Sequence, residues 1–276
     1  MTNDSKALAA LDGTIVLAGA GKMGSALLTG WLKGGLAANR IAVLEPTPSP
    51  DIIELAAQGV RLNPDAAAIG AVAALVIAVK PQIFGAAAAP LKPIAAGDTL
   101  LVSIMAGLTI AKIEAACSGA VVRAMPNTPA AIGRGMTVAV CSPRVKPHQR
   151  AIADALLRAT GAVEWVEDES LMDAVTAVSG SGPAYVFLLA EELARAGTAA
   201  GLPAALAATL ARETIAGSAA LLHQAKLDPA MLRQNVTSPG GTTAAALEVL
   251  MGKDGLQALM IRAVAAATKR SKDLAS

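Results

Sequence analysis

A short apolar run leads into a glycine-rich turn in Thr14-Ile15-Val16-Leu17-Ala18-Gly19-Ala20-Gly21-Lys22-Met23-Gly24. The spacing G-x-G-x-x-G between a strand and a helix is typical of dinucleotide-binding domains. Gly19 permits the tight turn, Gly21 lets a pyrophosphate approach the backbone, and Gly24 allows the helix to lie close to the sheet. We therefore expect a dinucleotide to bind at this turn, which consists of Gly19, Ala20, Gly21, Lys22, Met23 and Gly24.

Short apolar strands alternate with helical stretches through the first part of the chain. The sequence predicts strands at 14–18, 41–44, 73–79, 99–103, 120–124, 136–140 and 162–166. It predicts helices at 22–33, 51–58, 82–91, 110–116 and 147–160. Near-continuous apolar strands joined by crossover helices indicate an α/β domain, residues 1–166, with a parallel sheet covered on both faces.

The character of the chain changes from Asp168 onward, where strand patterns end and long Ala- and Leu-rich helices follow. These helices are apolar on more than one face, as in residues 185–196 and 204–222. A small lone bundle cannot cover so much apolar surface, so we expect an oligomer interface. The sequence thus predicts a second, all-α domain over residues 167–276.

Composition narrows the range of partners. The formal net charge is +2 and only 2% of residues are aromatic, so neither electrostatics nor ring stacking favours nucleic acid. Cys117 and Cys141 form no metal-spaced pair and no disulfide framework, and no metal is expected. No apolar run approaches the roughly 18 residues of a membrane span, and no signal peptide is expected. We expect a soluble cytoplasmic protein that takes a small-molecule ligand.

Glu45 ends the second predicted strand, where an acidic side chain accepts hydrogen bonds from an adenosine ribose diol. This position favours NADH. Thr47 and Ser49 follow in a Pro-rich loop, and Arg40 and Arg61 are near in sequence. Any of these four residues could bind the 2′-phosphate of NADPH, so the sequence leaves NADPH as an alternative cofactor.

Polar groups also follow two other strands, at Ala78-Val79-Lys80-Pro81 and at Asn127-Thr128. Ligands of open α/β sheets lie over the carboxyl ends of the strands. We therefore expect these residues to border the nicotinamide. The alternatives are an ordinary exposed lysine at Lys80 and a turn-forming Asn127 between prolines.

A second glycine-rich helix start stands near the end of the chain, in Val236-Thr237-Ser238-Pro239-Gly240-Gly241-Thr242-Thr243. Gly240 and Gly241 let backbone N–H groups approach a ligand, and the following helix adds its unpaired donors and positive dipole end. Ser238, Thr242 and Thr243 supply neutral donors. This pattern predicts an anion site, and its alternative is a capped helix after a tight turn.

Together these blocks resemble the pyrroline-5-carboxylate reductase family over nearly the whole chain. The resemblance rests on Gly19 to Gly24, Ala78 to Pro81, Ser103 to Gly107, Arg123 to Ala130, Ser179 to Tyr185 and Ser238 to Thr243. It implies an N-terminal Rossmann domain and a C-terminal helical domain that forms a homodimer, which assembles in many members into a larger ring such as a decamer. The departure is Glu45-Pro46, in a region that in many relatives favours the NADPH phosphate.

The family resemblance implies reduction of a cyclic imine carboxylate to proline, with NADPH or NADH as the hydride donor. Ala106 and Gly107 would join the cofactor site. Ser238, Gly240, Gly241, Thr242, Thr243 and Asn127 would bind the substrate, and Thr243 would act catalytically by orienting the ring nitrogen. The imine brings its own proton, which leaves positioning and exclusion of water to the protein.

Two other functions compete with this interpretation. A β-hydroxyacid or other imine dehydrogenase of the same superfamily normally has a catalytic lysine early in the helical domain, and residues 179–200 contain none. A non-catalytic nucleotide-binding sensor is the alternative from another class. The three hydroxyls of Ser238, Thr242 and Thr243 argue against the sensor.

Overall fold

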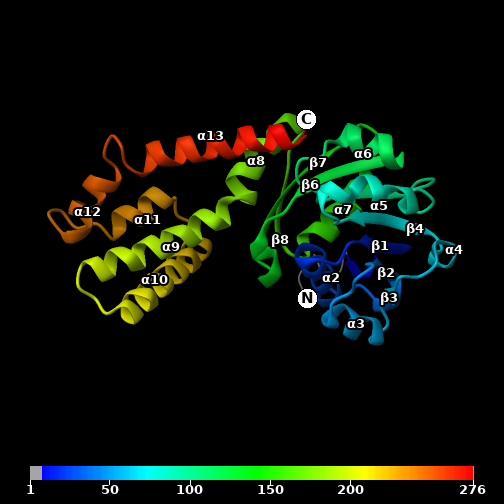
Figure 1. The fold of residues 1–276 in the computed structure, drawn as a ribbon, viewed down its shortest axis with the longest axis horizontal. Helices are drawn as coiled ribbons and strands as arrows, with labels where there is room; N and C mark the ends of the chain where they lie inside the picture. Colours follow the sequence, from blue (N-terminus) through cyan, green and yellow to red (C-terminus); the bar gives the residue numbers. More distant parts are fainter. Residues whose placement is uncertain (1–7, 276) are drawn as a thin grey trace. The chain divides into compact units, whose positions relative to one another are not determined.

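The structure is a computed structural model and describes residues 8–275. Residues 1–7, where no signal peptide is expected, and residue 276 lie outside the described part. The described chain divides into two compact units (Figure 1). The first extends to Gly180 and takes in the last turns of the C-terminal helix from Thr268, and the second is Ser181–Ala267.

An eight-stranded sheet with the order β3-β2-β1-β4-β5-β6-β7-β8 forms the centre of the first unit. Its strands are β1 (Thr14–Ala18), β2 (Ile41–Leu44), β3 (Arg61–Leu62), β4 (Val72–Ile77), β5 (Leu100–Ser103), β6 (Ala120–Met125), β7 (Gly135–Cys141) and β8 (Gly161–Trp165). All neighbours pair in parallel except β6 and β7, which are antiparallel. The order reverses direction between β1 and β4, which makes the carboxyl ends of these two strands a switch point for ligand binding.

Helices cover both faces of this sheet (Figure 1). They are α2 (Lys22–Lys33), α3 (Pro50–Ala57), α4 (Ala66–Ile69), α5 (Phe84–Leu91), α6 (Ile110–Cys117), α7 (Pro147–Arg158) and α8 (Met172–Val175). Alternate residues of β1 point to opposite faces, so Ile15 joins one core with Trp31 of α2, while Val16 joins the other with Ile113 of α6. The Trp31 indole N–H donates to the Leu156 carbonyl at 2.8 Å and ties α2 to α7.

The predicted α/β class is confirmed, and β1, β2 and α2 begin and end where the sequence places them. Two features differ from the expectation. The two-residue strand β3 is too short to give a period-two pattern, and it was not predicted. The sheet is not wholly parallel, because β7 follows β6 after a connection too short to hold the crossover helix that a parallel neighbour needs.

Packing extends the first unit beyond the last strand. Met172 of α8 is buried in the core below β6 and β7, and the Ser271 hydroxyl donates to the Asp173 carboxylate at 2.7 Å. A π-helical turn, Thr176–Gly180, ends this unit. The division by packing therefore comes after Gly180, whereas the division by sequence pattern comes after residue 166, where strands give way to helices.

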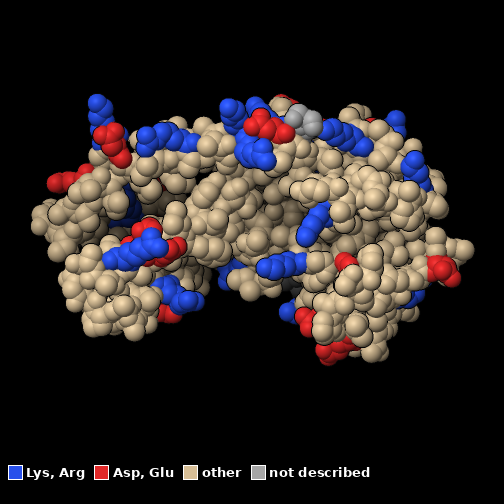
Figure 2. Space-filling view, in the orientation of Figure 1, with Lys and Arg blue, Asp and Glu red and all other residues tan. Residues whose placement is uncertain are grey.

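The second unit consists of helices. They are α9 (Gly182–Ala199), α10 (Ala204–Gln224), α11 (Pro229–Asn235), α12 (Thr242–Leu250) and α13 (Leu256–Ala275), whose last turns belong to the first unit. No residue of α9 or α12 is buried, and Phe187 of α9 is 68% exposed. Figure 2 shows charged side chains in small groups on a surface that is otherwise uncharged.

The described residues include one helix whose apolar character bears on the expectation about membranes. Helix α10 is long and apolar enough to cross a membrane by length and composition, and only 11% of its apolar window is buried within the chain. Arg212 and Glu213 lie in the middle of α10. The same apolar surface is what a helical oligomer interface requires.

Candidate functional site

The glycine turn after β1 has the geometry that its spacing predicts. Gly19 has φ +93°, and a Cβ there would lie 2.8 Å from the Ala78 carbonyl oxygen, which follows the neighbouring strand β4. A Cβ on Gly24 would collide with the Gly19 carbonyl oxygen. Two of the three glycines are therefore required by the fold itself.

Gly21 differs from the other two glycines. A Cβ there would meet nothing within 4 Å among the described residues, so the fold does not require glycine at this position. Gly21 is the N-cap of α2 and no side chain caps the helix, which leaves the first-turn N–H groups free to bind an anion. The residues present fit a dinucleotide pyrophosphate, because the open space lies at a helix N-terminus over the switch point of the sheet.

Glu45 meets this turn directly. Its Oε2 accepts a hydrogen bond from the Ala20 backbone N–H at 2.8 Å, and its Oε1 accepts from the Thr47 N–H at 3.0 Å. The carboxylate is half-buried at the carboxyl end of β2. The structure therefore brings Glu45 to the glycine turn, as the sequence predicts.

Arg40 and Arg61, which the sequence offered as ligands for the 2′-phosphate of NADPH, do not lie at the glycine turn. Arg40 donates to the Gly13 carbonyl at 3.0 Å, and Arg61 donates to the Thr14 hydroxyl at 2.9 Å. Both partners stand at the amino end of β1, the edge of the sheet opposite the glycine turn. Neither guanidinium lies at the candidate cofactor site.

The segment after β4 lies beside the glycine turn. The Ala78 N–H donates to the Ala18 carbonyl at 2.8 Å, and Ala78 and Val79 lie next to Gly19, with Lys80 and Pro81 following them in the chain. Lys80 is exposed. The segment after the next strand contains Ala106 and Gly107, and its path is fixed by the Met105 N–H, which donates to the buried Ser103 hydroxyl at 3.3 Å.

Asn127 is held within the first unit. Its Oδ1 accepts from the Met136 N–H at 2.8 Å, and its Nδ2 donates to the Ser179 carbonyl at 3.2 Å and the Ser179 hydroxyl at 3.3 Å. The amide thereby joins the end of β6 to β7 and to the π-helical turn. This structural role was not predicted, because a turn Asn and a ligand-binding Asn have the same local sequence.

The predicted anion site lies in the second unit. Gly240 has φ +69°, the Gly241 N–H donates to the Ser238 carbonyl at 3.0 Å, and α12 begins at Thr242 without a side-chain cap. Ser238 and Thr242 are exposed and Thr243 is half-buried. Gly241 stands at the N-cap of α12 and no side chain caps the helix, so its first-turn N–H groups have no side-chain partner.

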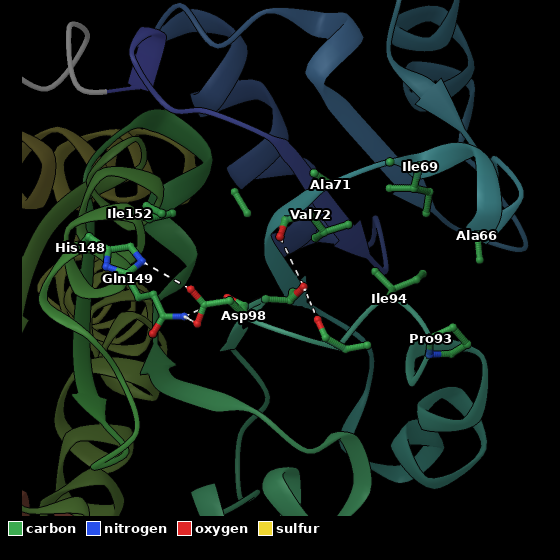
Figure 3. Close-up of a pocket in the computed structure, with 14 residues that line it drawn as sticks. Ala66, Ile69, Ala71, Val72, Pro93, Ile94, Asp98, His148, Gln149 and Ile152 are labelled. Atoms are coloured by element: carbon green, nitrogen blue, oxygen red, sulfur yellow. Dashed lines mark hydrogen bonds and ion pairs between the residues drawn. The ribbon is translucent and has the colours of Figure 1, made fainter.

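A separate hollow of about 490 Å³ opens at the amino ends of β4 and β5 (Figure 3). Asp98 lies in it and accepts from the Gln149 amide, and Lys146 Nζ lies 2.7 Å from its carboxylate. The Lys146 ammonium lowers the pKa of Asp98 below its ordinary value. This hollow lies at the sheet edge opposite the glycine turn and contains none of the predicted site residues.

The described residues contain no group of three or more His, Cys, Asp or Glu side chains arranged to hold a metal ion. Both cysteines are free. Burial is the main influence on each thiol and raises the pKa of Cys117 and of Cys141. Nucleophilic thiol chemistry is therefore disfavoured.

Comparisons with known proteins match segments in both units of the chain. The family model for pyrroline-5-carboxylate reductase dimerisation matches residues 169–274, and that for NADP oxidoreductase, coenzyme F420-dependent, matches residues 14–107. A pyrroline-5-carboxylate reductase of Synechocystis sp. is 46% identical over 219 residues, which cover 78% of this chain and 80% of that protein.

Solved structures give the same result. A pyrroline-5-carboxylate reductase from Coxiella burnetii superposes with a TM-score of 0.88 at 34% identity, over 96% of this chain and 99% of that one. The Plasmodium falciparum pyrroline carboxylate reductase, with NADP bound, has a TM-score of 0.80 at 30% identity, over 96% of this chain and 99% of that one. The similarity therefore extends through both units.

Proposed function

The chain belongs to the pyrroline-5-carboxylate reductase family, and on this premise we propose that it reduces 1-pyrroline-5-carboxylate to L-proline with NADH or NADPH. It is an NAD(P)H-dependent oxidoreductase of proline biosynthesis. The observation that carries the proposal is the open space at Gly21. A glycine that the fold does not need, at an uncapped helix start over the switch point, is explained by a ligand that approaches the backbone.

We assign the substrate carboxylate to the start of α12. The backbone N–H groups there, together with the hydroxyls of Ser238 and Thr242, are neutral donors that bind a carboxylate through the helix dipole. A protein cation at the same place would repel the protonated imine. Neutral donors avoid that repulsion and keep the imine carbon electrophilic.

The cofactor, when bound, supplies a hydride to the imine carbon and is left oxidised. The C–H bond forms as the C=N π bond breaks, and the electron pair of that bond goes to the ring nitrogen, which already carries its proton. The protein therefore needs no acid of its own. Thr243 is half-buried in the first turn of α12, and we assign its hydroxyl to orienting the ring nitrogen.

The remaining predicted residues are assigned to the cofactor. Gly19 to Gly24 and Glu45 hold the adenosine and pyrophosphate portion, and Ala78 to Pro81 with Ala106 and Gly107 border the nicotinamide. Support comes from their common position at the carboxyl ends of β1, β2, β4 and β5. Asn127 is assigned to positioning the π-helical turn through Ser179 rather than to direct contact with substrate.

A spectrophotometric assay tests the function. Absorbance at the nicotinamide band is followed with NADH or NADPH, with and without 1-pyrroline-5-carboxylate, and the product is identified as proline by chromatography. We expect absorbance to fall only when the imine is present. No loss with either cofactor, from protein that binds the cofactor, would contradict the reductase and favour a nucleotide sensor.

We further propose a homodimer formed by the helical region, which matches the family's dimerisation model and exposes the apolar faces of α9 and α12. Assembly of dimers into a ring such as a decamer, a cytoplasmic location, and a functional division near residue 166 belong to the same proposal. Light scattering at several concentrations distinguishes a dimer from a ring by mass.

A further inference from the structure

The Glu45 carboxylate is fixed at the glycine turn by hydrogen bonds to both of its oxygens. Oε2 accepts from the Ala20 N–H at 2.8 Å, and Oε1 accepts from the Thr47 N–H at 3.0 Å. Two backbone donors hold the side chain in position. The Glu45 carboxylate therefore stands beside the loop that we assign to the dinucleotide.

Asn63 holds the backbone of Glu45 in place. Its Oδ1 accepts from the Glu45 N–H at 2.8 Å and its Nδ2 donates to the Glu45 carbonyl at 2.9 Å. The last residues that β2 and β3 pair with each other are Val43 and Leu62, and Leu62 is the residue directly before Asn63. The Asn63 backbone, at φ +47°, donates its N–H to the Val43 carbonyl at 2.7 Å, and its side chain extends the pairing to Glu45.

Positive charge near this carboxylate is scarce. Residues 45–60 contain Glu45, Asp51 and Glu54 and no Lys or Arg. Arg40 and Arg61 donate to groups at the opposite end of β1, as described above. Two exposed lysines lie in the neighbouring segments, Lys22 in the first turn of α2 and Lys80 after β4.

We propose that this enzyme prefers NADH to NADPH, with Glu45 as the specificity-determining residue and Asn63 as the residue that positions it. The carboxylate accepts hydrogen bonds from the ribose diol of NADH. It repels the 2′-phosphate of NADPH, which carries up to about two negative charges by analogy with other phosphate monoesters. The inference deepens the proposed function and rests on it, because it concerns the same cofactor site.

Cofactor binding without substrate tests the preference. NADH and NADPH are titrated into the full chain while nicotinamide fluorescence is followed. We expect a lower Kd for NADH, and we expect Glu45→Ser to shift the ratio of the two Kd values by about tenfold toward NADPH. Higher ionic strength should narrow the gap in the unmodified protein, because salt screens the repulsion.

Matched variants distinguish a change in cofactor selectivity from a general loss of folded structure. Glu54→Gln removes a negative charge from the exposed face of α3 and should leave the ratio unchanged within about twofold. Asn63→Gly keeps the left-handed backbone but loses both hydrogen bonds to Glu45, so it should shift the ratio in the direction of Glu45→Ser. The melting temperature reports any general loss of structure.

Three outcomes overturn the inference. A lower Kd for NADPH in the unmodified protein, unaltered by Glu45→Ser, would show that Thr47 or Ser49 holds the phosphate. A selective loss of NADPH binding in Lys22→Met would assign the phosphate to Lys22. If Asn63→Gly left the ratio of the two Kd values unchanged, Asn63 would have no role in positioning Glu45. Failure of both cofactors to bind would instead contradict the proposed function.

Discussion

Arg123 and Glu169 form an ion pair that joins the central sheet to the first residue matched by the family's dimerisation model. Arg123 Nη1 lies 2.8 Å from Glu169 Oε1, and the two side chains are 6% and 30% exposed. The same oxygen accepts from the Ile110 N–H at the start of α6. One carboxylate thus ties together β6, α6 and the segment that leads to the helical region.

Replacement of Arg123 should destabilise the protein. Arg123→Met leaves the Glu169 carboxylate partly buried without its cation, so we expect the free energy of unfolding to fall by about 1–3 kcal/mol. Denaturant unfolding measures the change. Lys146→Met, which breaks an exposed pair with Asp98, is the control and should have little effect. Equal midpoints for the two variants would contradict a stabilising role for the buried pair.

Gly21→Val should abolish cofactor binding while the fold survives. The position has open space in the protein, so the side chain collides only with the bound pyrophosphate. We expect affinity to fall by more than about a hundredfold, near 2.7 kcal/mol, with an unchanged melting temperature. Gly24→Ala is the contrasting variant, because its methyl group meets the Gly19 carbonyl and should lower stability. Normal affinity in Gly21→Val would mean that the turn is structural only.

Thr243→Ala should slow turnover and leave cofactor binding intact. The loss of one preorganised donor in an enzyme site costs about one to three orders of magnitude in kcat. Steady-state kinetics with saturating cofactor measures the loss, and fluorescence titration checks the cofactor. Thr243→Ser keeps the hydroxyl and should recover most of the rate. A rate unaffected by the alanine variant would refute the role assigned to Thr243.

The exposed apolar face of α9 should be needed for assembly. Phe187→Glu puts a charge where 68% of the side chain is exposed in the single chain, and we expect dimers to dissociate and activity to fall. Ile53→Glu makes the same change at an exposed position on α3 and should leave the mass unchanged. A chain ending at Val166 should be monomeric and inactive. Full-length protein that light scattering finds monomeric and active would contradict the dimer.

Stability should fall at alkaline pH. Burial raises the pKa of Cys117 and Cys141 above the ordinary value of 9.0, so the folded state holds each proton more tightly than the unfolded chain. The contribution is fully present below the ordinary pKa and is lost as pH rises through the raised value. Melting temperature as a function of pH measures it, and the double variant Cys117→Ala with Cys141→Ala should show a weaker alkaline decline. Equal declines would contradict this cause.

Much of the fold follows from local sequence. The run Thr14–Ala18 and the glycines after it specify a buried strand, a tight turn and a close helix, and each of these is where the spacing predicts it. The start of α12 after Gly240 and Gly241 is likewise readable from residues in sequence order. These features depend on side-chain periodicity and on backbone sterics, which act over a few residues.

The sequence by itself therefore determined the α/β class, the glycine turn and the second helix start. Each of these depends on side-chain periodicity and backbone sterics among residues that are neighbours in the chain. Only the tertiary structure decided which polar groups meet. Asn63 pairs with Glu45 across 18 positions, Arg61 reaches Thr14 across 47, and Asn127 reaches Ser179 across 52. Such partners are set by the order of strands in the sheet, which brings distant segments together and leaves no local pattern in the chain.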